Sequence, residues 1–162
     1  MKIHTRVMIA ASLALAFTAC KKEEAAAPVV AAPLAAPTTD DKAAWNAYLQ
    51  DQVPRHMEGI TNSPFIYRVP AQENPTDPEE YTRLVEKAKL DAARGIVKGN
   101  MLAYAGRDPS RTADLVVAAF DGVPANTMQG VRVVYIGDAA NSERVSAAVA
   151  PAGVEYVFVE AK

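Results

Sequence analysis

The C-terminal 120 residues alternate between two kinds of hydrophobic pattern. Short runs rich in β-branched and aromatic residues predict strands at 101–105, 131–136 and 154–159. Between these runs, apolar residues recur every three or four positions, which predicts helices that begin near Asp108 and near Asn141 or Ser142. Strands that alternate with helices favour a parallel sheet with right-handed crossovers. We therefore expect a small single α/β domain built on a β-α-β-α-β unit.

Two further helices and one extended segment are expected before this unit. Trp45, Leu49 and Val53 recur every four residues and predict a helix over 41–53 that ends at Pro54. Residues 64–70 are apolar and aromatic and lie between two prolines. This pattern predicts either an edge strand or an extended loop pinned to the core. The same segment is a candidate partner-binding edge if its aromatic residues face solvent.

The second helix of this region is predicted from its first residues. Asp77 is a suitable cap, Pro78 suits the first helical position, and Glu80 completes a pattern similar to a capping box. Its apolar face is predicted to consist of Tyr81, Leu84, Val85, Ala88, Ala92 and Ile96, and Gly99 ends it. Both N-terminal helices are expected to pack on the open face of the sheet or to extend it. The pattern does not give the order of the strands.

The hydrophobic periodicity disappears before residue 40. Residues 25–37 are almost wholly Ala, Val, Leu and Pro, and the prolines at 28, 33 and 37 prevent a continuous helix. Such a composition predicts a flexible, partly extended linker. We therefore divide the chain into a leader at 1–19, a linker at 20–39 and a globular domain at 40–162.

The leader has a positive start and a short apolar core. Lys2 and Arg6 precede Val7–Ala19, an uncharged run of 13 residues. A helix that crosses a bilayer core of about 30 Å needs roughly 20 residues, so this run suits a signal peptide rather than a membrane span. It ends in Phe17-Thr18-Ala19-Cys20, which contains the single cysteine of the chain. The segment resembles a bacterial lipoprotein signal peptide with its lipobox.

That resemblance implies a location in the cell and a lipid anchor in the membrane. In this family the chain is cut before the lipobox cysteine, here Cys20, and that cysteine carries the lipid. Phe17 stands where the family usually has Leu. Lys21 stands where Asp would favour retention in the inner membrane, so the resemblance implies an outer-membrane lipoprotein that faces the periplasm. The alternative is an ordinary secretory signal that happens to end in a cysteine. Once Cys20 is acylated, the mature chain has no thiol for disulfides, thiolate metal sites or catalysis.

Charge and motif content exclude several classes of function. Removal of Lys2 and Arg6 leaves 15 basic residues against 19 acidic ones, a net charge near −4, which argues against nucleic-acid binding. The chain has neither a GxGxxG nor a P-loop pattern for nucleotides, and no serine in a GxSxG context. His56 is the one histidine left after cleavage, too few for a multi-histidine metal site. We expect no cofactor and no bound metal.

The candidate binding site lies where two strands end. Ligands of open α/β sheets sit beyond the carboxyl ends of the strands, and loops 106–111 and 137–142 each combine a glycine with polar residues at a helix start. Backbone N–H groups and the helix dipole favour a small anion there. The candidate ligand-binding residues are Arg107, Ser110, Arg111, Asp138, Asn141 and Ser142. A purely structural explanation also exists: Asp108 and Asn141 cap the helices, and the arginines pair with Asp138 or remain solvated.

Two functions from different classes follow. The first is a non-catalytic binding or interaction module, held on the membrane by the lipid on Cys20, with an envelope protein or a small anionic ligand as its partner. The alternative is a small hydrolase-like enzyme or anion-binding protein that uses loops 106–111 and 137–142. Catalysis would require side chains such as Arg107, Asp138 and His56 to converge in one cleft.

Overall fold

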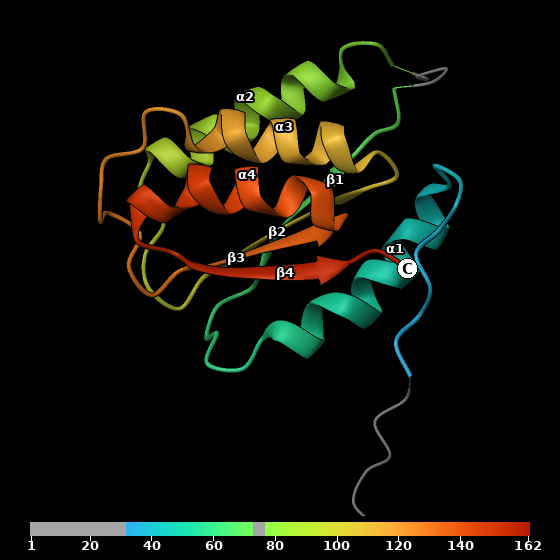
Figure 1. Ribbon diagram of the computed structural model, residues 1–162, viewed down its shortest axis with the longest axis horizontal. Coiled ribbons are helices and arrows are strands. Elements are labelled where there is room, and N and C mark those ends of the chain that lie inside the picture. The colour runs from blue at the N-terminus through green and yellow to red at the C-terminus, as the bar shows by residue number, and fades with distance from the viewer. Residues whose placement is uncertain (1–31, 73–76) are drawn as a thin grey trace, which may run out of the picture. The chain divides into compact units, whose positions relative to one another are not determined.

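A four-stranded parallel sheet lies at the centre of the computed structural model, which describes residues 32–72 and 77–162 (Figure 1). Each strand pairs in parallel with the next one along the chain. The strands, in their order across the sheet, are β1 (Phe65–Val69), β2 (Met101–Gly106), β3 (Arg132–Gly137) and β4 (Glu155–Glu160). The predicted α/β fold is confirmed, and residues 65–69 form an edge strand rather than a loop. The predicted leader, its lipobox and most of the predicted linker lie outside the described residues.

The helices cover the two faces of the sheet unequally (Figure 1). Three helices, α2 (Glu80–Ala93), α3 (Pro109–Phe120) and α4 (Ala139–Val149), connect successive strands and lie on one face. Helix α1 (Lys42–Gln52) and the 3-10 turn η1 (Val53–His56) lie on the other face. Because β1 precedes α2, that helix is itself a crossover, so it joins α3 and α4 rather than sharing a face with α1. Residues 32–162 form one compact unit of three layers.

The start and end of α2 differ from the prediction. Asp77 Oδ1 accepts from the backbone N–H of Glu79 at 3.0 Å and its carboxylate pairs with Arg83, but residues 77–79 form a turn before the regular helix. The helix therefore begins at Glu80, and its N-cap residue makes no side-chain cap bond. It ends at Ala93, since Gly95 takes a positive φ of 79°. The predicted helical residue Ile96 lies beyond that end and is buried in the core.

One other helix end was predicted wrongly, the start of α4. The cap of α4 is Asp138, whose carboxylate accepts from the backbone N–H of Asn141 at 3.0 Å, and not Asn141 or Ser142. β3 ends at Gly137, so the chain can turn into the helix one residue later. The predicted end of the first helix near Pro54 is confirmed, since α1 ends at Gln52. The missing N–H of proline is tolerated in a first turn, and the chain continues as a 3-10 turn to His56.

A row of aromatic side chains crosses the face of the sheet that α2, α3 and α4 cover. The four strand partners in this row are Tyr67, Tyr104, Tyr135 and Phe158. Tyr67 and Tyr104 stack with ring centroids 4.7 Å apart, and Tyr135 and Phe158 are 6.0 Å apart. The three tyrosines are almost fully buried, whereas Phe158 on the edge strand is partly exposed. The row belongs to the larger of two hydrophobic clusters, the one packed under α2, α3 and α4.

The opposite face of the sheet carries small side chains where α1 packs on it. Ala103 and Ala105 of β2 are fully buried there and leave space for the large side chains of the helix. Trp45 and Tyr48 fill that space and meet edge to face, with centroids 5.6 Å apart. Trp45 also donates its indole N–H to the carbonyl of Thr39 at 2.9 Å. The helix is therefore attached to the sheet by a second, smaller core.

Candidate functional site

The two candidate loops lie side by side at the carboxyl ends of β2 and β3. Asn141 donates from Nδ2 to Ser110 Oγ at 3.3 Å, which joins the first turns of α4 and α3. The prediction that these loops meet at one edge is confirmed. However, the strand order β1-β2-β3-β4 does not reverse, so the sheet has no switch point at which neighbouring loops diverge to form a crevice.

Acidic side chains already occupy both helix starts. Asp108 Oδ1 accepts from the backbone N–H of Arg111 at 3.0 Å, and Asp138 Oδ1 accepts in the same way from Asn141. These carboxylates take the amides that an anionic ligand would use, and their charge opposes a second anion there. The loops therefore resemble capped helix starts more than vacant anion sites.

The remaining polar groups of this region bind one another. Asn141 is almost buried; its Nδ2 donates to Asp138 at 2.7 Å, and its Oδ1 accepts from Arg144 Nε at 2.7 Å. Arg144 also donates to the carbonyl of Ser110 at 2.9 Å and pairs with Asp114 at 2.6 Å. The result is a polar connection between α3 and α4. The prediction missed Arg144, although its position three residues after Asn141 places both on one side of the helix.

The other predicted ligand residues point to separate places. The Arg111 guanidinium lies over the Tyr81 ring, 3.9 Å from its centroid. Ser142 Oγ bonds the Tyr156 hydroxyl of β4 at 3.0 Å. Arg107 lines a hollow of about 510 Å³ with Ala71, Gln72, Asp108 and Pro109. Of the six predicted residues, the structure thus joins Ser110, Asp138 and Asn141 in one network, whereas the side chains of Arg111 and Ser142 contact other elements and Arg107 lines the hollow.

His56 lies at the opposite end of the strands. Its carbonyl accepts from Arg132, the first residue of β3, at 2.5 Å, whereas the candidate loops follow the last residue. Arg132 also donates to the carbonyl of Glu58 at 2.9 Å and to both carboxylate oxygens of Glu155 at 2.9 Å. Burial and the charges of Arg132 and Arg55 lower the pKa of the His56 imidazole. His56 therefore does not converge with the strand-end residues.

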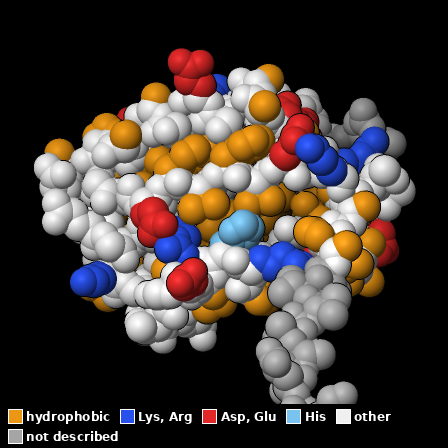
Figure 2. All heavy atoms as spheres, turned by 60° about the horizontal axis from the view of Figure 1, so that its bottom comes forward, with side chains coloured by type: hydrophobic (Ala, Val, Ile, Leu, Met, Phe, Trp, Pro, Cys, Tyr) orange, Lys and Arg blue, Asp and Glu red, His pale blue; other side chains and the backbone are white. Residues whose placement is uncertain are grey.

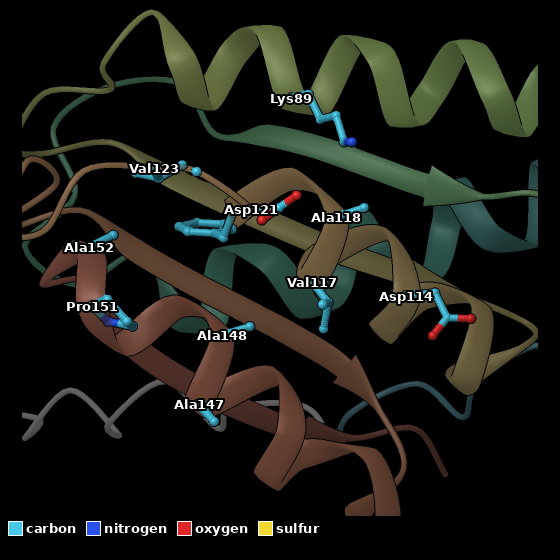
Figure 3. Close-up of a pocket in the computed structure, with 12 residues that line it drawn as sticks. Lys89, Asp114, Val117, Ala118, Asp121, Val123, Ala147, Ala148, Pro151 and Ala152 are labelled. Carbon is cyan, nitrogen blue, oxygen red and sulfur yellow. The ribbon is translucent and has the colours of Figure 1, made fainter.

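A groove in the helix layer was not foreseen (Figure 3). It has a volume of about 580 Å³, and it is lined by residues of α3 and the C-terminal part of α4 together with the segments that follow each of these helices. Val117 is 37% exposed there, and Ala118, Ala147 and Ala148 leave the space open. Lys89 reaches toward the groove from α2 (Figure 3). The groove offers apolar contact but brings no catalytic set of side chains together.

The two edges of the sheet differ in how they are protected. The β1 edge is short, lies between Pro64 and Pro70, and carries Arg68, which pairs with Asp40 at 3.0 Å. Prolines and charges of this kind prevent an edge strand from pairing with another chain. β4 has six residues, no proline, and charges only at its ends, Glu155 and Glu160. Among the described residues, no strand pairs with its outer edge. Two residues beyond β4, the carbonyl of Lys162 accepts from the backbone N–H of Ala36 at 2.5 Å.

Partly exposed hydrophobic side chains accompany the β4 edge on both faces. Tyr156 and Phe158 pack against the cluster under the crossover helices, and Val157 and Val159 pack against the one under α1. Seen with the lower side of Figure 1 turned forward, the molecule shows hydrophobic side chains in strips between backbone and polar side chains (Figure 2). The pattern that could have revealed this edge is the uncharged run between the two glutamates.

The described residues contain no group of three or more His, Cys, Asp or Glu side chains placed to hold a metal ion. None of the helices in residues 32–72 and 77–162 is long and apolar enough to cross a membrane. Comparison with protein-family models, with curated proteins and with solved structures finds no match for this chain.

Proposed function

We propose that this protein is a lipid-anchored, non-catalytic interaction module of a bacterial cell envelope, and that it binds a partner protein by adding an extended strand to β4. Cys20 carries the lipid, and the mature chain faces the periplasm from the outer membrane. The unique cysteine after a short apolar run and Lys21 behind it support the anchor. A lipid on Cys20 would bring the module to the membrane surface, and the linker would let it reach partners nearby.

One observation carries the binding function: in the described part of the chain β4 is an edge strand with no proline and no inner charge, flanked by partly exposed hydrophobic side chains. Strand addition uses the backbone groups of such an edge for affinity and the alternating side chains for specificity. The polar residues at the strand ends argue against the hydrolase alternative, because Asp108, Asp138 and Asn141 are engaged in caps and in mutual hydrogen bonds. A small-anion site is favoured only by the hollow beside Arg107.

The anchor is tested by metabolic labelling with a clickable palmitate analogue. The full chain should carry the label and fractionate with the outer membrane, and Cys20→Ser should lose the label and leave the membrane. Lys21→Asp is the matched control: it should keep the label and move the protein to the inner membrane. Equal labelling of the chain and of Cys20→Ser would refute the lipid anchor.

The binding edge is tested by photo-crosslinking in living cells. A benzoylphenylalanine at Phe158 should give a protein adduct, whereas the same residue at Ile66, on the guarded β1 edge and 47% exposed, should not. Arg107→Ala should leave the adduct unchanged. Adducts of equal yield at both edges, or an adduct that requires Arg107, would contradict a β4 interaction module.

A further inference from the structure

We infer that the strand that β4 takes up is β4 of a second copy of this chain, antiparallel to the first, with the two-fold axis passing beside Val157. The two sheets then form one continuous sheet of eight strands. This inference rests on the proposed function and names the partner of its binding edge. The observations behind it are the direction of the backbone groups, the order of the side chains and the protection of the opposite edge.

The backbone direction determines which residues of β4 are available. Glu155 N–H donates to the Val131 carbonyl at 2.8 Å, and Ala161 N–H donates to the Gly137 carbonyl at 2.8 Å, so both point toward β3. Hydrogen bonding alternates along a parallel strand, so the N–H and C=O groups of Tyr156, Phe158 and Glu160 point outward. In the described part of the chain no backbone group bonds these three residues from outside.

Two antiparallel registers place the two-fold axis at the middle of β4, one centred on Val157 and one on Phe158. The register centred on Val157 pairs Tyr156 of each copy with Phe158 of the other. These residues are hydrogen-bonded partners on the face that α2, α3 and α4 cover. This register places Val157 opposite its own copy on the other face. The register centred on Phe158 instead places Glu160 against Tyr156, whose hydroxyl already bonds Ser142. A cross-strand pair of two aromatic side chains stabilises a sheet more than a pair of Glu160 with Tyr156, so the Val157 register is favoured.

The side chains around this axis are complementary to themselves. Glu155 faces Val159 of the second copy, so no two carboxylates stand directly opposite each other. The pair of Phe158 with Tyr156 continues the aromatic row that already runs from Tyr67 through Tyr104 and Tyr135. A second copy therefore covers the half-exposed aromatic and valine side chains of both molecules at once.

The helix next to the edge leaves room for the second copy. A shallow hollow of about 590 Å³ lies between α4 and β4. Most of its lining residues are small, and they are Ala139, Ser142, Ser146, Ala147 and Ala150, with Glu143, Tyr156 and Phe158 beside them. Small side chains let two helices approach closely when their strands pair at about 4.8 Å. The two α4 helices would then face each other across the axis.

The guarded β1 edge explains why the assembly stops at two copies. A two-fold interface uses the same patch on both molecules and closes on itself, whereas two open edges would continue into a filament. Pro64, Pro70 and the Arg68–Asp40 pair protect β1, so one open edge remains for each copy.

The test uses residues 32–162, the compact unit that holds both hydrophobic clusters, and the full chain in cells. Sedimentation velocity should give the mass of two copies for the unit. Phe158→Pro should give the mass of one copy, because it removes an outward N–H and no bond to β3. Phe158→Ala keeps that N–H and should dimerise more weakly, and Ile66→Lys should still dimerise. The melting transition of each variant reports whether it is folded.

Single cysteines test the register, since residues 32–162 contain no other thiol. Directly opposite Cβ atoms are about 4.5–5.5 Å apart, and diagonal neighbours about 7–8 Å. Val157→Cys should therefore form an intermolecular disulfide several-fold faster than Phe158→Cys or Val159→Cys. Faster linkage at 158 overturns this register, and a single-copy mass for the folded wild-type unit at every concentration overturns self-pairing. If that unit is a single copy while the Phe158 photo-adduct in cells contains a different protein, the proposed function stands and this inference fails.

Discussion

The ring of Tyr135 lies over Gly137, two residues further along the same strand. A Cβ atom at 137 would collide with the phenol ring and its hydroxyl. This position of the ring lets the Tyr135 hydroxyl donate to the carbonyl of Pro109 in the first turn of α3, at 3.0 Å. The glycine at the end of β3 thus serves packing, whereas a glycine before a helix start had suggested a ligand loop.

Gly137→Ala is expected to destabilise the domain by about 1–3 kcal/mol, because an added methyl group in a packed core forces side chains off their rotamers. Urea denaturation of residues 32–162 measures the loss. Tyr135→Leu is the matched partner. Because the double variant has no ring to collide with the added methyl group, its loss of stability should be smaller than the sum of the two single losses. Strictly additive losses would show that the ring does not occupy the space above Gly137.

Substitution by Phe should have different effects on stability at the two stacked tyrosines of the sheet, Tyr67 and Tyr104. Tyr67 donates to Asp91 at 2.8 Å, and burial together with Asp91 raises the pKa of Tyr67, so its hydroxyl stays protonated. Tyr104 is fully buried, and its hydroxyl has no hydrogen-bond partner among the described residues. Tyr67→Phe should cost about 1.5–3 kcal/mol, typical of a bond to a charged group, whereas Tyr104→Phe should be neutral or stabilising. Denaturation curves of the two variants compare them directly, and an equal loss in both would reveal a partner for Tyr104.

The parts of the fold that the sequence predicts well are those with a local cause. The strands at 101–105, 131–136 and 154–159 are runs of β-branched and aromatic residues, and they agree with β2, β3 and β4 to within one residue at each end. The cap of α3 was also found, because Asp108-Pro109 combines a capping side chain with proline at the first helical position.

The errors have causes that lie outside the local sequence. Asp77-Pro78 has the same local form as Asp108-Pro109, but residues 77–79 form a turn and the regular helix begins only at Glu80. Asp138 and Asn141 are both good caps, and only the end of β3 decides between them. The strand order, the aromatic row and the network of Arg144 depend on residues far apart in the sequence; Asp114 and Arg144, for example, are separated by 30 positions. Hydrophobic periodicity carries no information on such pairings.

The lowered pKa of His56 gives the domain a defined dependence on pH. The folded state holds the imidazole near Arg132 and Arg55 and partly away from water, so it binds the proton less readily than the unfolded chain. Stability should therefore rise with pH between the folded pKa and about 6.5, and should lose this contribution as the pH falls through that window. Proton NMR of residues 32–162, where His56 is the single histidine, should give a pKa below 6.5.

Two arginine variants separate the causes of this shift. Arg132→Gln should raise the pKa of His56 more than Arg55→Gln, because Arg132 is the stronger of the two charges acting on it. Burial remains in both variants, so neither should restore the value of the unfolded chain in full. A His56 pKa at or above 6.5 in the wild-type unit would contradict both the burial and the charge arrangement described here.

Asp138 distinguishes a structural strand-end loop from a binding one. Its carboxylate caps α4 and also accepts from the Asn141 side chain at 2.7 Å. Asp138→Ala should therefore lower stability by about 1 kcal/mol, whereas Asp138→Asn keeps a capping oxygen and should lose less. Since partner binding is assigned to β4, both variants should keep the sedimenting mass of the wild type and its photo-adduct at Phe158. A folded Asp138→Ala variant that loses the adduct would return the binding function to the loops at the strand ends.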